Sequence, residues 1–415
     1  MTRRRLPVVA ALIMYRAGSL YEPHGKSGLA HLTEHMMFRG TPTRPQGDID
    51  RLIGRVGGAN NAVTTSDHAT YYFTLPSEHW ATPLAIEADR MWNCDLDETT
   101  FGTERRVALE ERAMLDDDPE ALAFEAVDSL AFEGHPYEYP VVGLSSDLEG
   151  MTVDDVRDFY DDRYRPAEAV LAVVGDVRED QVAAEVERLF AKGAQVPRAS
   201  AVTARLERTD GEAVARRATA AGVDARPGAR GSGPRRTTLS GASPVPRVVL
   251  GYMTPEAMHE DTAALELLCA VLSSGRSSVL YRELVDGSGV ATEVSAYKLP
   301  QVEPGLLYVG ATLNAGESPE RCEDRLTGLI GDIVRDGVSE AAMERARNLT
   351  LVDVMIGRET CLGVAGAVAF WESLGGWRLG RDHEERLSRV TSDDVRRVAE
   401  AYLDPDGRSS AWLVP

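Results

Sequence analysis

The pattern of apolar and polar positions divides the chain into short strand-like runs and longer helical runs. Runs such as "PVVAALIMYRAG", "TYYFTL", "AVLAVVG" and "GLLYVGATL" are rich in Val, Ala, Leu or Tyr, as buried strands are. Runs such as "DTAALELLCAVLSS" and "VSEAAMERARNLTLVDVM" are longer, and their apolar residues recur with helical spacing. Because each half of the chain mixes both kinds, the sequence predicts an α+β fold class, with α/β as the variant.

Two segments share one ordered series of residues. Residues 151–176 and 390–415 both read Thr-x-Asp-Asp-Val-Arg, then a tyrosine, then a proline shortly after it, then an apolar run. Each copy predicts a helix capped by its threonine and followed by a strand, so two similar halves are expected. Between them Gly, Pro, Ser, Ala and Arg dominate, which is typical of a linker. We predict domains at 1–195 and 246–415, joined by a Gly/Pro/Arg-rich linker at 196–245.

The composition narrows the functional classes. The chain has 415 residues, 43% hydrophobic and 27% charged, which suits a globular protein that buries a core without disulfides. Its net charge of −21 would repel phosphate, so neither nucleic acid nor an anionic membrane is expected as a partner. No apolar run is long enough to span a bilayer. The four cysteines form no metal-spaced pair, so reduced thiols are expected.

The first residues, "MTRRRLPVVAALIMYRAGS", allow two interpretations. Three arginines followed by about ten apolar residues outline a secretory signal. The same apolar run, closed by a glycine turn, fits a buried strand. The strand is preferred because cleavage would leave almost nothing ahead of the helix expected to begin near Ser27. A cytoplasmic protein is therefore expected, and secretion would follow from the other interpretation.

The run "LAHLTEHMMFRGTP" places two imidazoles and a carboxylate on one expected helix. His31 and His35 are four residues apart, so they share a face and can bind one ion through ring nitrogens. Glu34 lies beside them. Two such histidines with a neighbouring glutamate are typical of zinc metalloproteases, in which the glutamate takes a proton from the attacking water. The order His-x-x-Glu-His is the inverted form of the motif.

A catalytic zinc site needs a third protein ligand. The run "TERRVALEERAMLDDDPE" offers Glu104, Glu110 and Glu111 on an expected helix. Glu104 and Glu111 are two turns apart and share a face. A solvated acidic helix, pairing with the arginines of the same run, is the alternative interpretation for each glutamate taken alone.

In these segments the chain resembles the insulinase, pitrilysin and mitochondrial processing peptidase family of zinc metallopeptidases. The resemblance rests on the inverted motif and, in order, on "GSLYEPHGKSGLAHLTEHMMFRGT", "GGANNAVTTSDHATYYFTL", "HPYEYPVVG" and "YRPAEAVLAVVGD". It implies two homologous α/β-roll domains of the mitochondrial-processing-peptidase-like metallohydrolase type. The first would be the zinc-binding peptidase domain, and the second a peptidase-like inactive domain.

The resemblance also implies roles for individual residues. His31, His35 and Glu111 would hold one Zn²⁺ per chain, since Glu111 stands at the family's spacing from the motif. Glu34 would be the general base. Glu104, seven residues before the third ligand, would support the site from behind it.

Further residues of the resemblance concern the substrate. In "NNAVTT", Asn61 and Ala62 would offer edge-strand backbone to an extended peptide; without the resemblance, Asn61 would be interpreted as a turn residue. In the second half the family often places an arginine and, seven residues later, a tyrosine that reach the substrate. Arg282 fits the arginine, but Gly289 stands where the tyrosine is expected.

The leading hypothesis is a zinc metalloendopeptidase that acts on peptides or unfolded polypeptide segments. Two alternatives stay open: a non-catalytic assembly subunit, a role that the family includes, and a zinc hydrolase with a non-peptide substrate. A chain of this size resembles half of the larger family members, so we expect a homodimer or a heterodimer with a related subunit. His68 and His135 are interpreted as structural, because zinc already has three ligands.

Overall fold

The computed structural model describes residues 6–191, 233–241 and 243–415. These residues form two compact units, neither of which is contiguous in sequence. Unit 1 comprises residues 6–112, 139–191 and 355–380, and unit 2 comprises residues 113–138, the described residues of 233–354, and 381–415. Each half of the chain therefore contributes one segment to the other unit. The domains predicted at 1–195 and 246–415 are contiguous in sequence and do not include this exchange of segments.

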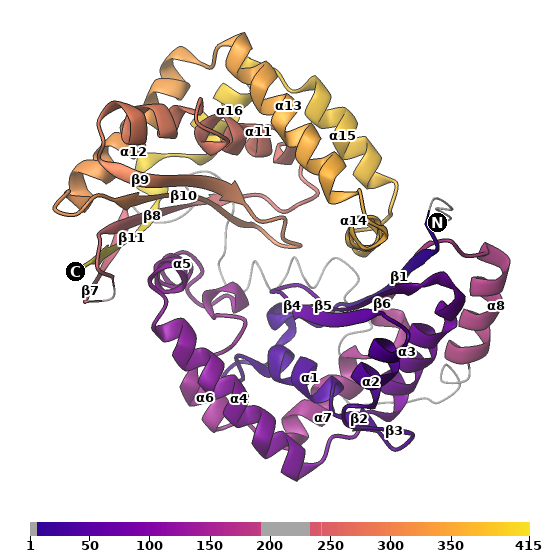
Figure 1. Cartoon of the computed structure of the whole chain (residues 1–415). Helices are drawn as coiled ribbons and strands as arrows, with labels where there is room; N and C mark the ends of the chain where they lie inside the picture. Colours follow the sequence, from indigo (N-terminus) through magenta and orange to yellow (C-terminus); the bar gives the residue numbers. More distant parts are fainter. Residues whose placement is uncertain (1–5, 192–232, 242) are drawn as a thin grey trace. The chain divides into compact units, whose positions relative to one another are not determined.

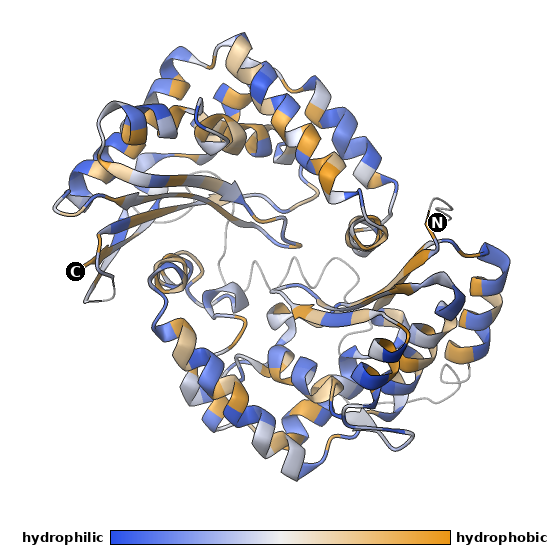
Figure 2. Ribbon diagram, viewed as in Figure 1, coloured by the Kyte–Doolittle hydropathy of each residue, from blue (hydrophilic) through white to orange (hydrophobic). Residues whose placement is uncertain are grey.

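Unit 1 is built on an antiparallel sheet with the strand order β4-β5-β1-β6 (Figure 1). Its strands are β1 (Val8–Tyr15), β4 (Ala59–Thr64), β5 (Ala69–Pro76) and β6 (Ala169–Gly175), beside a small ribbon of β2 (Gly40–Thr41) and β3 (Arg44–Pro45). Strand β1 is buried on both faces, with Ile13 in one core cluster and Leu12 in another. A strand of that kind is apolar at nearly every position, as Figure 2 shows along β1, and the strand predicted there is confirmed.

Helices cover both faces of this sheet. The helices of unit 1 are α1 (Leu29–Met37), α2 (Asp48–Arg55), α3 (Ala81–Asn93), α4 (Glu98–Asp116), α6 (Ser145–Glu149), α7 (Val153–Arg163), α8 (Glu179–Phe190) and α14 (Cys361–Ser373). The face that includes Ile13 packs against α1 and α7. The opposite face is covered by α14, whose Ala365 and Ala369 are fully buried against β1 and β6. Helix α14 is the segment that unit 1 receives from the C-terminal half, and its orange colour stands out there in Figure 1.

Unit 2 repeats the plan with one extra strand, in the order β7-β11-β8-β10-β9. Its strands are β7 (Arg235–Ser240), β8 (Arg247–Thr254), β9 (Ala291–Lys298), β10 (Gly305–Leu313) and β11 (Ser409–Val414). Its helices are α5 (Pro119–Ala131), α11 (Thr262–Ser273), α12 (Pro319–Asp336), α13 (Glu340–Gly357), α15 (Leu379–Arg389), α16 (Ser392–Tyr402) and the π-helix η6 (Tyr281–Gly287). Helix α5, received from the N-terminal half, packs on β8 and β11. A Cβ at Gly251 would lie 2.4 Å from Val127, so glycine there permits this close approach.

The internal repeat predicted from the sequence is confirmed. Thr152 and Thr391 each form a capping box at the start of α7 and α16, accepting a hydrogen bond from the third residue of the helix. Each helix leads into a strand, β6 or β11, that pairs antiparallel with the central strand β1 or β8 of its sheet. The two halves therefore place equivalent sequence at equivalent positions.

The linker predicted at 196–245 extends too far. Strand β7 falls inside it and pairs in parallel with β11; most of the remaining linker residues lie outside the described part of the chain. All four cysteines are free, as expected. No helix among the described residues is long and apolar enough to cross a membrane.

Candidate metal centre

Helix α1 carries the inverted motif and is fixed at its N-terminus. Gly28 has φ +90°, and a Cβ there would meet the carbonyl oxygen of Val142 at 2.4 Å. The backbone N–H groups of Gly28 and Ala30 donate to the Glu22 carboxylate at 3.2 and 2.8 Å. Burial raises the pKa of Glu22 to about 8, against the opposing effect of these two bonds. Glu22 thus satisfies helix N–H groups that would otherwise have no partner.

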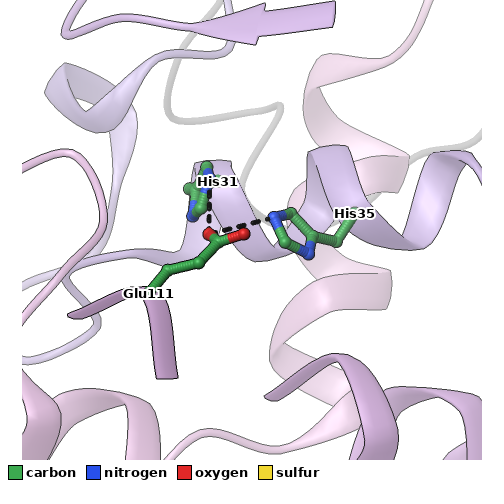
Figure 3. A group of neighbouring side chains, drawn as sticks. All are labelled: His31, His35 and Glu111. Atoms are coloured by element: carbon green, nitrogen blue, oxygen red, sulfur yellow. Dashed lines mark ion pairs between the residues drawn. The ribbon is translucent and has the colours of Figure 1, made fainter. Parts of the chain in front are cut away.

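The three residues predicted as zinc ligands lie together. His31 and His35 extend from α1 toward Glu111 on α4 (Figure 3). The Nε2 atoms of both histidines are 3.5 Å from one carboxylate oxygen of Glu111. These three side chains form the one group of histidine, cysteine and acidic residues in the described chain that could hold a metal ion.

The geometry of this group fits a zinc ion. Ligand atoms bound about 2.1 Å from a tetrahedral zinc lie about 3.4 Å apart, close to the two 3.5 Å separations. Burial, followed by the nearby His35, lowers the pKa of His31 to about 4, so its imidazole is neutral near pH 7, as a metal ligand must be. The buried His31 Nδ1 has no hydrogen-bond partner among the described residues.

Glu104, on the same helix as Glu111, contacts His35 and Arg39. One of its carboxylate oxygens is 3.3 Å from His35 Nδ1 and accepts a hydrogen bond from the Arg39 guanidinium at 2.7 Å. Its side chain is only 2% exposed. The Nδ1 side of the His35 ring thus meets Glu104, while its Nε2 faces Glu111. Glu110, the third glutamate of that run, is exposed and belongs to no metal group.

Glu34, the candidate general base, lies on α1 between His31 and His35 in sequence. It is half-buried, and one of its carboxylate oxygens accepts a hydrogen bond from the Thr64 hydroxyl at 2.6 Å. Burial raises the pKa of Glu34, and the hydrogen bond from Thr64 opposes that rise. Thr64, like Arg39, was not found from the sequence: its contact joins two elements thirty positions apart, and no local pattern indicates it.

The candidate substrate residues lie in different places. Asn61 and Ala62 are on β4, which pairs only with β5 in the described sheet and is therefore an edge strand. The Asn61 side chain accepts a hydrogen bond from the Ala62 N–H at 2.9 Å. Arg282 belongs to unit 2, in η6, with its side chain 60% exposed and its guanidinium 3.9 Å from Glu283. Gly289 follows η6 with φ +64°.

The two histidines interpreted as structural are not part of the metal group. His68 is buried beside a turn, where burial lowers its pKa to about 4. His135 lies in unit 2, and its Nε2 is 2.7 Å from the Glu303 carboxylate, with both side chains buried.

An inverted His-x-x-Glu-His helix with a distant glutamate, carried by one of two related units, defines the class of the inverted-motif metallopeptidases. Family models agree with this class. The model described as "Insulinase (Peptidase family M16)" matches residues 5–144, and "Peptidase M16 inactive domain" matches residues 150–350. The chain belongs to peptidase family M16.

Relatives that align along almost the whole chain are named zinc proteases. The "Uncharacterized zinc protease Mb2805c" of Mycobacterium bovis is 31% identical over 395 residues, which cover 93% of this chain and 84% of that protein. The "Zinc protease PqqE" of Helicobacter pylori is 25% identical over 409 residues, covering 98% and 88%.

Solved structures share the fold. A protease from Helicobacter pylori superposes with a TM-score of 0.88 at 24% identity, covering 100% of this chain and 96% of that one. A structure titled as the peptidase M16 inactive domain from Pseudomonas fluorescens gives a TM-score of 0.84 at 16% identity, covering 100% and 94%. The predicted fold of two related domains is therefore confirmed.

Proposed function

We propose that this chain is a zinc-dependent metalloendopeptidase that hydrolyses peptide bonds in peptides or unfolded polypeptide segments. The observation that carries the proposal is the convergence of both histidines of α1 on Glu111 at 3.5 Å. The names of the relatives, which call them zinc proteases, support the same metal. A non-catalytic subunit would have no need of a complete ligand set with its supporting Glu104, so the intact set favours the enzyme.

In the proposed reaction His31, His35 and Glu111 hold the metal. A zinc ion bound there would supply Lewis-acid polarisation of the substrate carbonyl. Glu34 accepts the proton of the attacking water and later delivers it to the departing amine. Glu104 keeps His35 in one orientation and is not itself a reacting group.

The proposed substrate lies extended along β4. Because β4 is an edge strand, its outward backbone groups can pair with an added peptide strand. The Ala62 N–H now bonds to the Asn61 side chain, so the bound peptide would replace that internal bond. A mode that pairs backbone with backbone accepts extended chains in preference to folded domains.

We also propose that the chain works as a dimer, either with itself or with a related subunit. Support comes from unit 2, where Arg282 is exposed but the residue seven positions later is Gly289. The positive φ of Gly289 disfavours a tyrosine there. A second subunit could supply the missing substrate contact.

The test of the proposed function separates the base from the ligands. Purified protein should contain about one zinc per chain and cleave an unfolded peptide library. Glu34→Gln should keep the zinc while turnover falls at least ~100-fold, because the amide cannot accept the proton of water. Wild-type protein that holds zinc but cleaves no peptide, either alone or with a related subunit added, would refute the proposal.

A further inference from the structure

The strand that is proposed to bind substrate also contacts the proposed base. Thr64 is the last residue of β4, and its hydroxyl donates to Glu34 on α1 at 2.6 Å. This is the one hydrogen bond that Glu34 receives from the described residues. In β4, Ala62 and Thr64 are more buried than their neighbours Asn61 and Val63, which places Thr64 on the face of the sheet toward α1.

The backbone around Thr64 is firmly held. In the turn that follows, the Thr65 N–H donates to the carbonyl of His68 at 2.8 Å, and the Thr65 hydroxyl accepts the His68 N–H at 3.1 Å. The same turn is tied to the segment after β1, because Leu20 N–H donates to the carbonyl of Ser66 at 2.8 Å. The position of Thr64 is therefore set by the backbone contacts of the turn, and its hydroxyl can orient the Glu34 carboxylate.

We propose that Thr64 is a positioning residue for Glu34, an inference that rests on the proposed peptidase function. The threonine hydroxyl holds one carboxylate oxygen, which leaves the other free to accept the proton of the attacking water. Because Thr64 is in the same strand as Asn61 and Ala62, one element sets both the register of the peptide and the orientation of the base. Substrate binding and proton abstraction are thereby aligned by β4.

The test compares Thr64→Val with Thr64→Ser. Valine keeps the β-branched shape but removes the donor, whereas serine keeps the hydroxyl. Loss of one hydrogen bond to a charged group should lower kcat by about ten- to a hundredfold, with KM and zinc content close to wild type. Thr64→Ser should recover most of the lost kcat. Thr74→Val, on β5 at the far end of the β4 pairing, is the matched control and should leave both constants unchanged.

The steady-state constants distinguish positioning from damage to the strand. A distorted β4 would raise KM, since that strand is the proposed peptide site, so a KM effect without a kcat effect overturns the inference. Unchanged kcat in Thr64→Val also overturns it. In a Glu34→Gln background the valine substitution should cause no further loss, whereas an additive loss would show that Thr64 acts elsewhere. If wild-type protein cleaves no peptide, the proposed function fails first, independently of Thr64.

Discussion

Replacing Glu104 by glutamine should weaken zinc binding without removing a ligand. The carboxylate is almost fully buried, and a single oxygen serves both His35 Nδ1 at 3.3 Å and Arg39 at 2.7 Å. Glutamine keeps the shape and an acceptor oxygen but loses the negative charge that strengthens both interactions. It also leaves the Arg39 guanidinium beside a neutral group.

The size of the effect follows from this geometry. Losing a supporting partner of a metal-binding histidine typically costs about ten- to a hundredfold in affinity, or about 1.4 to 2.7 kcal/mol. The 3.3 Å contact with His35 is long for a charge-assisted hydrogen bond. We therefore expect a loss near the lower end, about tenfold.

The assay is competition for zinc with a chromophoric chelator, on metal-free wild-type and variant protein. Glu110→Gln is the matched control, because Glu110 is an exposed glutamate on the same helix and should leave the affinity unchanged. An affinity equal to wild type in Glu104→Gln would refute the supporting role. Complete loss of zinc would instead make Glu104 a ligand.

Three further expectations concern the metal, pH and assembly. His31→Ala should lower bound zinc sharply and abolish cleavage; near-stoichiometric zinc in elemental analysis would contradict the ligand assignment. Burial raises the pKa of Asp128, which accepts from Tyr308 in unit 2, to about 7. The folded state therefore binds the extra proton, and stability should fall as pH rises from about 4 to about 7. Asp128→Asn should flatten that slope in denaturant titrations, and an unchanged slope would exclude Asp128 as its cause. Light scattering should give about twice the 45.1 kDa of one chain; a fully active monomer would refute the dimer.

Residues related by local spacing were the ones that the sequence could predict. His31 and His35 follow from helical periodicity, and their helix forms as predicted. Placing Glu111 beside the histidines needed the family resemblance, because nothing in the local sequence distinguishes it from an exposed neighbour such as Glu110. The contacts of Thr64 and Arg39 were not predictable, since they depend on which helix face meets which strand or carboxylate.

The division into units was missed for a similar reason. Composition marks a break where Gly, Pro and Arg gather, and that signal is absent at 112 and 354, where the chain changes units inside α4 and α13. The linker predicted at 196–245 includes β7 because "RRTTLS" has no apolar run. Its arginines are accommodated by tertiary contacts: Arg236 lies 3.0 Å from the buried Glu323 and over the Trp412 ring.

Helices α5 and α14, which the two halves of the chain exchange, affect whether this protein can be cut into separate domains and how it unfolds. A fragment ending near residue 195 would contain every proposed zinc ligand but would lack α14, exposing the sheet face that includes Leu12 and Met14. Exposed apolar surface of this kind favours aggregation. In the intact chain, detachment of α14 uncovers the sheet of unit 1, and detachment of α5 uncovers the sheet of unit 2. Unfolding of one unit is therefore coupled to unfolding of the other. The two units should therefore unfold in a single cooperative thermal transition, although each unit has a separate core.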